Sequence, residues 1–280
     1  MSSSPHSVNP LGRAPRRPSS TRRAQFNAGP RKHLGIAHVS LVVLASFASR
    51  VAAIDTTVKS IVVGATDHTC ALMDDSSLMC WGSNNSGKLG VLKLPNTYVT
   101  SPVGPVNLGS GRTAKALSLG NSHTCAILDD DTLKCWGSGS SGQLGYGPTS
   151  TQYTIPSSSV TLGAGVTSVS VGSLHTCAIL ANAGLKCWGQ NSKGQVGDGT
   201  TTQRNSPVDV DLGTGYTAKL ISTSARTSCA ILNDDSIKCW GENIFGVYGT
   251  GTLLASADNL PTPTVLPIGL TAKSISLGGA

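Results

Sequence analysis

Short apolar segments rich in strand-forming residues recur along the chain, and their spacing predicts β-strands rather than helices. The segment Thr124–Leu128 is an example, because every residue after the first is apolar or a cysteine. In a strand, successive side chains point to opposite faces, so Cys125 and Ile127 lie on one face and Ala126 and Leu128 on the other. A strand that is apolar on both faces is buried on both sides. We therefore expect this segment to lie between two neighbouring sheets.

This segment belongs to a motif of fifteen residues that occurs four times between residues 68 and 241. The second copy starts at His123 and reads His-Thr-Cys-Ala-Ile-Leu-Asp-Asp-Asp-Thr-Leu-Lys-Cys-Trp-Gly. In every copy the two cysteines are ten positions apart, and a tryptophan follows the second cysteine directly. The first cysteines of consecutive copies are 55, 52 and 52 residues apart, which indicates an array of structural repeats. The tryptophans are Trp81, Trp136, Trp188 and Trp240.

Each repeat carries the pattern of about four strands. A strand-like segment precedes each motif, at Val58–Val63, Ala114–Leu119, Val166–Val171 and Ala218–Thr223, with a fifth at Ala272–Leu277. The two halves of the motif form the second and third strands. The fourth predicted strand is a Val-x-Leu run, at Val106–Leu108, Val160–Leu162 and Val210–Leu212. Connections of varying length, rich in Pro, Gly, Ser and Thr, are expected to be loops.

Four-stranded sheets with a period of about fifty residues are typical of a β-propeller, in which the sheets pack face to face around an axis. We therefore predict an all-β fold for residues 54–280. The predicted units cover about 57–108, 113–162, 166–212 and 217–268, with part of a fifth at 271–280.

The motif, followed by Trp-Gly-x-Asn and then Gly-Gln-Leu-Gly, resembles the repeat of the regulator of chromosome condensation family, whose members form seven-bladed propellers. The resemblance covers nearly all of residues 57–280. The fourth copy departs from it, because Thr227 replaces histidine and residues 246–249 read Gly-Val-Tyr-Gly. Four copies and part of a fifth cannot close a ring of seven, so we expect a partial or open array.

The eight cysteines occupy two repeat positions, and a hairpin between them explains all four copies. Folding the chain at Asp75, Asp130, Asn182 and Asp234, residue types that tolerate left-handed backbone and bond locally, places the two cysteines of each copy opposite each other. Directly opposed residues are within disulfide range, although a register slip of one residue would weaken the geometry. The predicted disulfides are Cys70–Cys80, Cys125–Cys135, Cys177–Cys187 and Cys229–Cys239.

Two other roles for the cysteines remain open on the sequence alone. The thiols can be free and pack as small apolar groups. A zinc site is the weaker alternative, because zinc ligand pairs are usually two to four residues apart. Disulfides fit an oxidising compartment, and closing each loop contributes roughly 2.5–3 kcal/mol in the chain-entropy model.

The net charge of +7 is unevenly placed. Residues 1–53 hold eight basic groups and no acidic group, so residues 54–280 carry 13 basic and 14 acidic residues. The nearly neutral body lacks the basic surface of a nucleic-acid-binding domain, and any such contact would come from the arm of residues 1–53.

The same arm has the order of a secretory signal. Basic residues precede the uncharged run Leu34–Ser49, and Val51-Ala52-Ala53 supplies small side chains for cleavage after Ala53. A signal anchor is an alternative, but the run is short for a membrane span of about 20 residues. An organelle transit peptide or a nuclear-import segment also fits residues 1–33. We expect a secreted or cell-surface protein with no stable membrane span.

The remaining candidate residues favour structural roles. His68, His123 and His175 share one repeat position, and each precedes a threonine, so a repeated hydrogen bond is favoured over a metal site or a general base. We expect the tryptophans to pack between repeats. The sequon at Asn84 predicts a possible glycosylation site. Acid, base and nucleophile motifs are not evident, so we predict no enzyme activity, no cofactor and no metal.

We therefore expect a non-enzymatic extracellular or surface scaffold that binds an unidentified protein or glycan ligand through its loops. The family resemblance implies an alternative, which is guanine-nucleotide exchange on a Ran-type small GTPase with chromatin contact through the basic arm. A secreted enzyme inhibitor is a further alternative.

Overall fold

The computed structural model describes residues 57–91, 97–102, 104–243, 248 and 271–278, and the backbone of 258–264. The chain divides into two units, Met1–Ala52 and Ala53–Ala280. The first unit, with the predicted signal and basic arm, lies outside the described residues. Within the described part of the chain, no helix is both long enough and apolar enough to span a bilayer.

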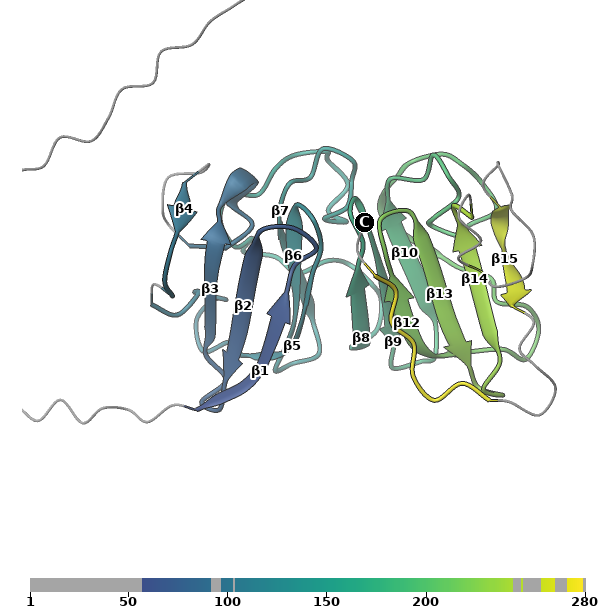
Figure 1. Cartoon of the computed structure of the whole chain (residues 1–280), viewed down its shortest axis with the longest axis horizontal. Helices are drawn as coiled ribbons and strands as arrows, with labels where there is room; N and C mark the ends of the chain where they lie inside the picture. The colour runs from purple at the N-terminus through teal and green to yellow at the C-terminus, as the bar shows by residue number, and fades with distance from the viewer. Residues whose placement is uncertain are drawn as a thin grey trace, which may run out of the picture. The chain divides into compact units, whose positions relative to one another are not determined.

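The described residues of the second unit form four antiparallel sheets, which we call blades 1 to 4 (Figure 1). Blade 1 contains β1 (Val58–Val63), β2 (His68–Met73), β3 (Leu78–Ser83) and β4 (Tyr98–Val99), with the short 3-10 helix η1 (Asn85–Gly87) between β3 and β4. Blade 2 contains β5 (Ala114–Leu119), β6 (His123–Leu128) and β7 (Leu133–Gly137). Blade 3 contains β8 (Val166–Val171), β9 (His175–Leu180), β10 (Leu185–Gly189) and β11 (Arg204–Asp209). Blade 4 contains β12 (Ala218–Thr223), β13 (Thr227–Leu232), β14 (Ile237–Gly241) and β15 (Asp258–Thr264).

Consecutive blades pack face to face, and their first strands β1, β5, β8 and β12 lie next to one another in that order. One apolar cluster fills each space between two blades. Between blades 1 and 2, for example, Leu72 and Leu78 pack with Leu128 and Trp136. All six residues of β6 are buried, which confirms the predicted burial on both faces. The fold is therefore an open β-propeller array, as the repeats predicted.

The hairpin between the second and third strands forms in the predicted register. Cysteine lies opposite cysteine in every blade, and all eight cysteines form disulfides with Cα–Cα separations of 4.0–4.1 Å. At the tip of blade 1, the Asp75 carboxylate accepts a 2.9 Å hydrogen bond from the backbone N–H of Ser77. The left-handed residue is Ser76, with a φ of 63°, and not Asp75. The aspartate therefore contributes the local bond, and the following residue makes the turn.

The predicted fourth strands are wrong. The outer strands β4 and β11 come before the place expected for them, and the Val-x-Leu runs are not strands. The fourth repeat had no predicted outer strand, and β15 forms there. Each run makes one ladder-like bond, such as Val160 N–H to the Leu133 carbonyl at 2.8 Å. Its valine and leucine are buried, as Val160 and Leu162 show. The alternation of apolar residues in these runs thus indicates side-chain burial at an interface between blades. A β-strand also needs a neighbouring strand with which its backbone pairs. In blade 2, an isolated bridge between Gly137 and Gln152 takes the place of an outer strand.

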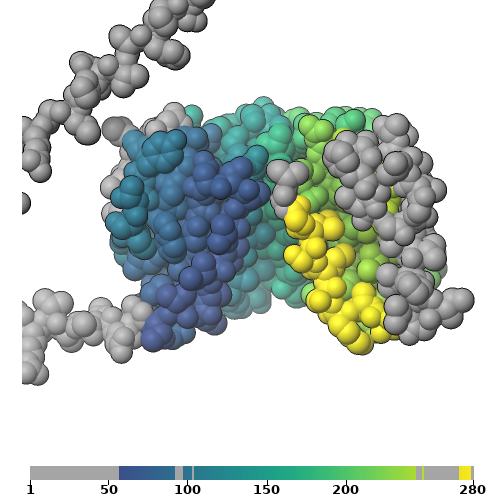
Figure 2. Space-filling model, viewed as in Figure 1, coloured from purple at the N-terminus to yellow at the C-terminus, as the bar shows by residue number. Residues whose placement is uncertain are grey.

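The fifth strand-like segment, Ala272–Leu277, also does not form a strand. It lies against blade 4, where the Leu277 N–H donates to the Ser222 hydroxyl at 2.9 Å. Figure 2 shows this segment in yellow on the green surface of blade 4. Val171 N–H makes the same bond to Ser118 at 3.0 Å, so the segment occupies the position of a next first strand. It lacks a ladder partner among the described residues, which explains why it is not a strand.

Candidate functional site

A polar network of four residues links blades 1 and 2 inside the apolar interface. His68 Nε2 lies 3.1 Å from the Thr124 hydroxyl oxygen. The Thr124 hydroxyl donates to the backbone carbonyl of Lys88 at 2.8 Å. The indole N–H of Trp136 donates to the same carbonyl at 3.0 Å. One backbone carbonyl of blade 1 therefore accepts hydrogen bonds from both a hydroxyl and an indole of blade 2.

The same network recurs at the next two interfaces. Between blades 2 and 3, His123 Nε2 lies 2.8 Å from the Thr176 hydroxyl, and both Thr176 and Trp188 donate to the Gln143 carbonyl at 2.9 Å. Between blades 3 and 4, the corresponding residues are His175, Ser228, Gln195 and Trp240. The three histidines thus take part in repeated bonds between blades, which is the structural role that their shared position predicted.

The hydroxyl donates its hydrogen to the carbonyl, so its oxygen accepts the Nε2–H of the histidine. In the neutral ring, this arrangement selects the Nε2–H tautomer. Burial is the main cause that lowers the pKa of His68 to about 4, of His123 to about 3 and of His175 to about 4. No group of histidine, cysteine and acidic side chains in the described part of the chain could hold a metal ion.

Sequence reasoning missed the partners of the histidines. Each histidine bonds a hydroxyl on the next blade, and that hydroxyl in turn donates to a backbone carbonyl seven positions after the tryptophan of the histidine's own blade. A signal for the hydroxyl was present, because threonine or serine follows this position in all four copies. The carbonyl belongs to Lys88, Gln143 or Gln195, and no side-chain pattern marks a backbone acceptor.

Trp81 differs from the other three tryptophans. It is partly exposed, whereas Trp136, Trp188 and Trp240 are fully buried. Neither its indole nor the hydroxyl of Thr69 makes the repeated bond to a carbonyl within the described residues. Packing between two repeats is therefore confirmed for Trp136, Trp188 and Trp240, whereas Trp81 lies on a face of blade 1 that no described blade covers.

The predicted glycosylation site at Asn84 conflicts with the fold. The Asn84 side chain is fully buried, and its Oδ1 accepts a hydrogen bond from the Leu89 N–H at 3.1 Å. Asn191 and Asn243 hold the backbone of Val196 and Tyr248 in the same way. A glycan on Nδ2 would need space that the packed loop fills. The asparagine is therefore a loop anchor.

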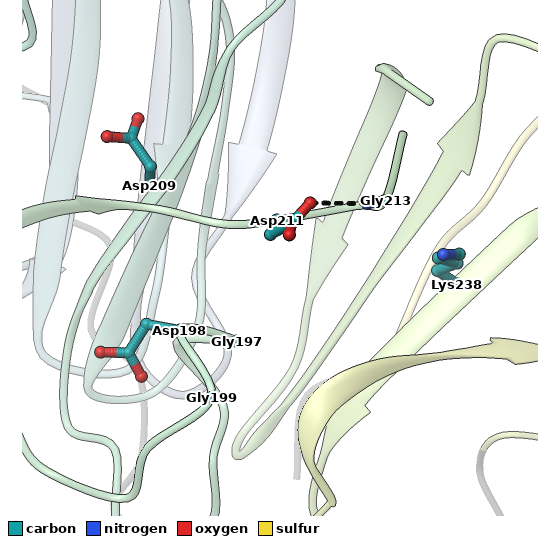
Figure 3. A pocket seen from close by; sticks show the side chains of 7 residues that line it. All are labelled: Gly197, Asp198, Gly199, Asp209, Asp211, Gly213 and Lys238. Carbon is teal, nitrogen blue, oxygen red and sulfur yellow. Dashed lines mark hydrogen bonds between the residues drawn. The ribbon is translucent and has the colours of Figure 1, made fainter. Parts of the chain in front are cut away.

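Two equivalent grooves open at the rim of the array, one between blades 2 and 3 and one between blades 3 and 4. The first groove has a volume of about 470 Å³ and is lined by Gly145, Tyr146, Ser158, Ser159, Thr161, Ser206 and Pro207. The second has about 450 Å³ and is lined by Gly197, Asp198, Gly199, Asp209, Asp211, Gly213 and Lys238 (Figure 3). The first groove is therefore hydroxyl-rich and uncharged, and the second carries three carboxylates and one lysine.

The charged groups of the second groove already have partners. Burial raises the pKa of Asp198, but hydrogen bonds, led by the one from Arg204, lower it below its ordinary value overall. Asp209 pairs with Lys186 at 2.7 Å, and the Asp211 carboxylate accepts the Gly213 N–H at 2.7 Å.

Lys238 stands opposite these carboxylates and is also engaged. Its ammonium donates to the Leu212 carbonyl at 2.7 Å and lies 5.0 Å from the centre of the Tyr216 ring. These contacts fix the shape of the groove without bringing an acid, a base and a nucleophile together.

Models of the regulator of chromosome condensation (RCC1) repeat match residues 58–88, 114–143 and 166–195, and also 130–179 and 187–231. The chain is 27% identical over 197 residues to the ultraviolet-B receptor UVR8 of Arabidopsis thaliana, covering 70% of this chain and 44% of the receptor. It is 27% identical over 187 residues to the human E3 ubiquitin-protein ligase HERC2, covering 66% of this chain and 4% of the ligase.

Two solved structures share the fold. Human WBSCR16 has a TM-score of 0.71 at 19% identity, over 81% of this chain and 59% of that one. Prp20p of Saccharomyces cerevisiae, described with its binding to Gsp1p and histones, has a TM-score of 0.67 at 21% identity, over 79% of this chain and 52% of that one. The chain thus spans about half the length of UVR8 and of these two proteins, and a small part of HERC2. Because the repeat models together match more than half of its residues, the chain belongs to the family of proteins built from regulator of chromosome condensation (RCC1) repeats.

Proposed function

We propose that this chain is a non-enzymatic binding scaffold that recognises a protein partner through the grooves between its blades. One observation carries the proposal. Two grooves of similar volume occupy equivalent places, yet Tyr146, Ser159 and Thr161 line one where Asp198, Asp209 and Asp211 line the other. A constant framework with variable lining is how repeat proteins vary their specificity.

Photo-crosslinking tests this function. A photoreactive amino acid is placed at Thr161 or Asp209 in the grooves, and at Asp130 or Asp234 at the hairpin tips as controls. We expect crosslinks to one partner from the groove positions and few from the tips. The exchange of Asp209→Ser with Asp211→Thr should then weaken binding of that partner, with only a small change in thermal stability because the lost contacts are at the surface. The proposal fails if every partner found binds the exchanged variant as tightly as the parent chain.

We also propose that the protein is secreted or displayed at the cell surface. The signal-like order of residues 1–53 supports this location, and so do four buried disulfides, which persist in oxidising compartments. N-terminal sequencing of the natural protein should find Ile54 as the first residue. Retention of residues 1–33 would contradict secretion.

Regulation of a small GTPase is the second candidate. The fold likeness to Prp20p and the eight basic groups of residues 1–53 support it. A nucleotide-exchange assay with a Ran-type GTPase separates the two functions. Acceleration of nucleotide release would favour this candidate, and an unchanged rate would favour the scaffold.

A further inference from the structure

The second ring nitrogen of each interface histidine has no hydrogen-bond partner among the residues that the structure describes. Nδ1 of His68, His123 and His175 is buried and unpaired within the described residues. Glycine backbone fills the adjacent space at two of the rings. A Cβ added to Gly64 would lie 2.6 Å from His68 Nδ1, and one added to Gly172 would lie 2.6 Å from His175 Nδ1. These sites therefore suit the neutral ring, whose Nδ1 needs no acceptor.

Protonation changes this balance because a charged imidazole donates from both nitrogens. Nε2–H keeps its bond to the hydroxyl of the next blade, but Nδ1–H becomes a buried donor without an acceptor. An unsatisfied buried donor is costly, and an unsolvated charge is more so. The ring can take up a proton at low cost only if the interface opens to water.

We propose that the three buried histidines make the interfaces between consecutive blades open in mildly acidic solution. The opening would loosen the same interfaces that form the rim grooves, so a ligand held there would be released as its surroundings acidify. The opening itself goes beyond the proposed function, because it requires no knowledge of the partner.

The charged surroundings of the rings do not oppose this effect. Lys88, which is paired with Asp67, disfavours a charge on His68, whereas Asp67 favours it and has the smaller influence. His123 is affected by His175 and His68, which disfavour its protonation. For His175, burial is the single cause that lowers the pKa. No carboxylate of the described residues hydrogen bonds to any of the three rings.

The sign follows from the folded and unfolded pKa values. An unfolded histidine takes up its proton near a pKa of 6.5, and the folded residues do so only at about 3 to 4. Their contribution to stability is therefore complete above pH about 6.5 and is lost as the pH falls toward the folded pKa values. In this window the folding equilibrium constant should fall by up to about tenfold per pH unit for each histidine.

Urea unfolding of the full oxidised chain, followed by tryptophan fluorescence between pH 7.5 and 4.5, tests the proposal. Trp136, Trp188 and Trp240 report directly, because each shares its carbonyl with the hydroxyl that the histidine binds. The comparison variant combines His68→Gln, His123→Gln and His175→Gln. Glutamine can donate to the hydroxyl but does not titrate.

We expect the parent chain to lose at least a hundredfold in its folding constant between pH 6.5 and 4.5. The triple variant should lose less than tenfold. Leu128→Ala is the matched control, because it weakens the same interface without changing titration and should shift both ends of the profile equally. The proposal is overturned if the triple variant keeps the pH dependence of the parent, or if Leu128→Ala alone steepens it.

A second measurement applies if the triple variant does not fold. Hydrogen exchange of the unaltered chain, corrected for the intrinsic effect of pH, reports opening at the backbone N–H groups of β6, β9 and β13. We expect their protection to fall by at least tenfold from pH 7 to 5, while protection within the disulfide-closed hairpin tips falls less. Constant protection of the three strands over this range would overturn the proposal.

Discussion

The interface between blades 2 and 3 carries the same repeat positions as the uncovered face of blade 1, by which we mean the face that no described blade covers, but in different surroundings. At the covered interface, Trp188 is fully buried and Val171 is 6% exposed. At the uncovered face, Trp81 is partly exposed and Val63, the counterpart of Val171, is 68% exposed. The repeat therefore specifies one half of an interface, and the preceding blade supplies the carbonyl and the apolar surface that complete it.

The largest expected effect is the loss of a covered tryptophan. Trp188→Ala removes a fully buried ring together with its bond to the Gln143 carbonyl, and should lower the free energy of unfolding by about 3–5 kcal/mol. Trp81→Ala should lower it by less than about 1.5 kcal/mol, because its ring is partly solvated already. Urea unfolding of both variants measures the difference. Equal losses would mean that coverage does not decide the contribution of this position.

Unlike the two tryptophans, the disulfides of blades 1 and 3 should contribute equally to stability. The double variant Cys177→Ala with Cys187→Ala opens a loop of the same length as Cys70→Ala with Cys80→Ala. Both cysteine pairs are ten residues apart and fully buried. Each double variant should lower the free energy of unfolding by roughly 2.5–3 kcal/mol, because the loss arises mainly in the unfolded chain. Thermal unfolding at neutral pH measures it. A clearly smaller loss in blade 1 would show that coverage also matters for the disulfides.

Removing the hydroxyl of the network should cause the smallest loss of stability among these variants. Thr176→Val leaves the Nε2–H of His123 without an acceptor, and should lower the free energy of unfolding by about 1–3 kcal/mol. Thr69→Val is the matched control and should have an effect within about 0.5 kcal/mol, since Thr69 lies on the uncovered face. If both variants unfold alike, the hydroxyl bond does not contribute measurably.

Local sequence predicted the features that depend on neighbouring positions along the chain. The spacing of Cys125 and Cys135 with Asp130 between them predicted the hairpin, its register and its disulfide, and the structure excludes the register slip and the free thiols that the sequence left open. The outer strands were misplaced because the alternation in Val160–Leu162 reports burial and not pairing. The sequon at Asn84 gave no sign that its amide anchors a buried loop.

By itself, the sequence determined the repeat, the disulfide-closed hairpin and the apolar faces of each blade. These features follow from side-chain alternation and from contacts within about ten residues. Only the tertiary structure decided which histidine meets which hydroxyl, which carbonyl receives the indole, and what lines each groove. Those partners lie 33 to 56 residues apart in the chain, as His68 with Thr124 and Thr176 with Gln143 show. They meet because consecutive blades pack on each other. Every residue has a backbone carbonyl, so no residue type in the sequence marks the one that accepts these bonds.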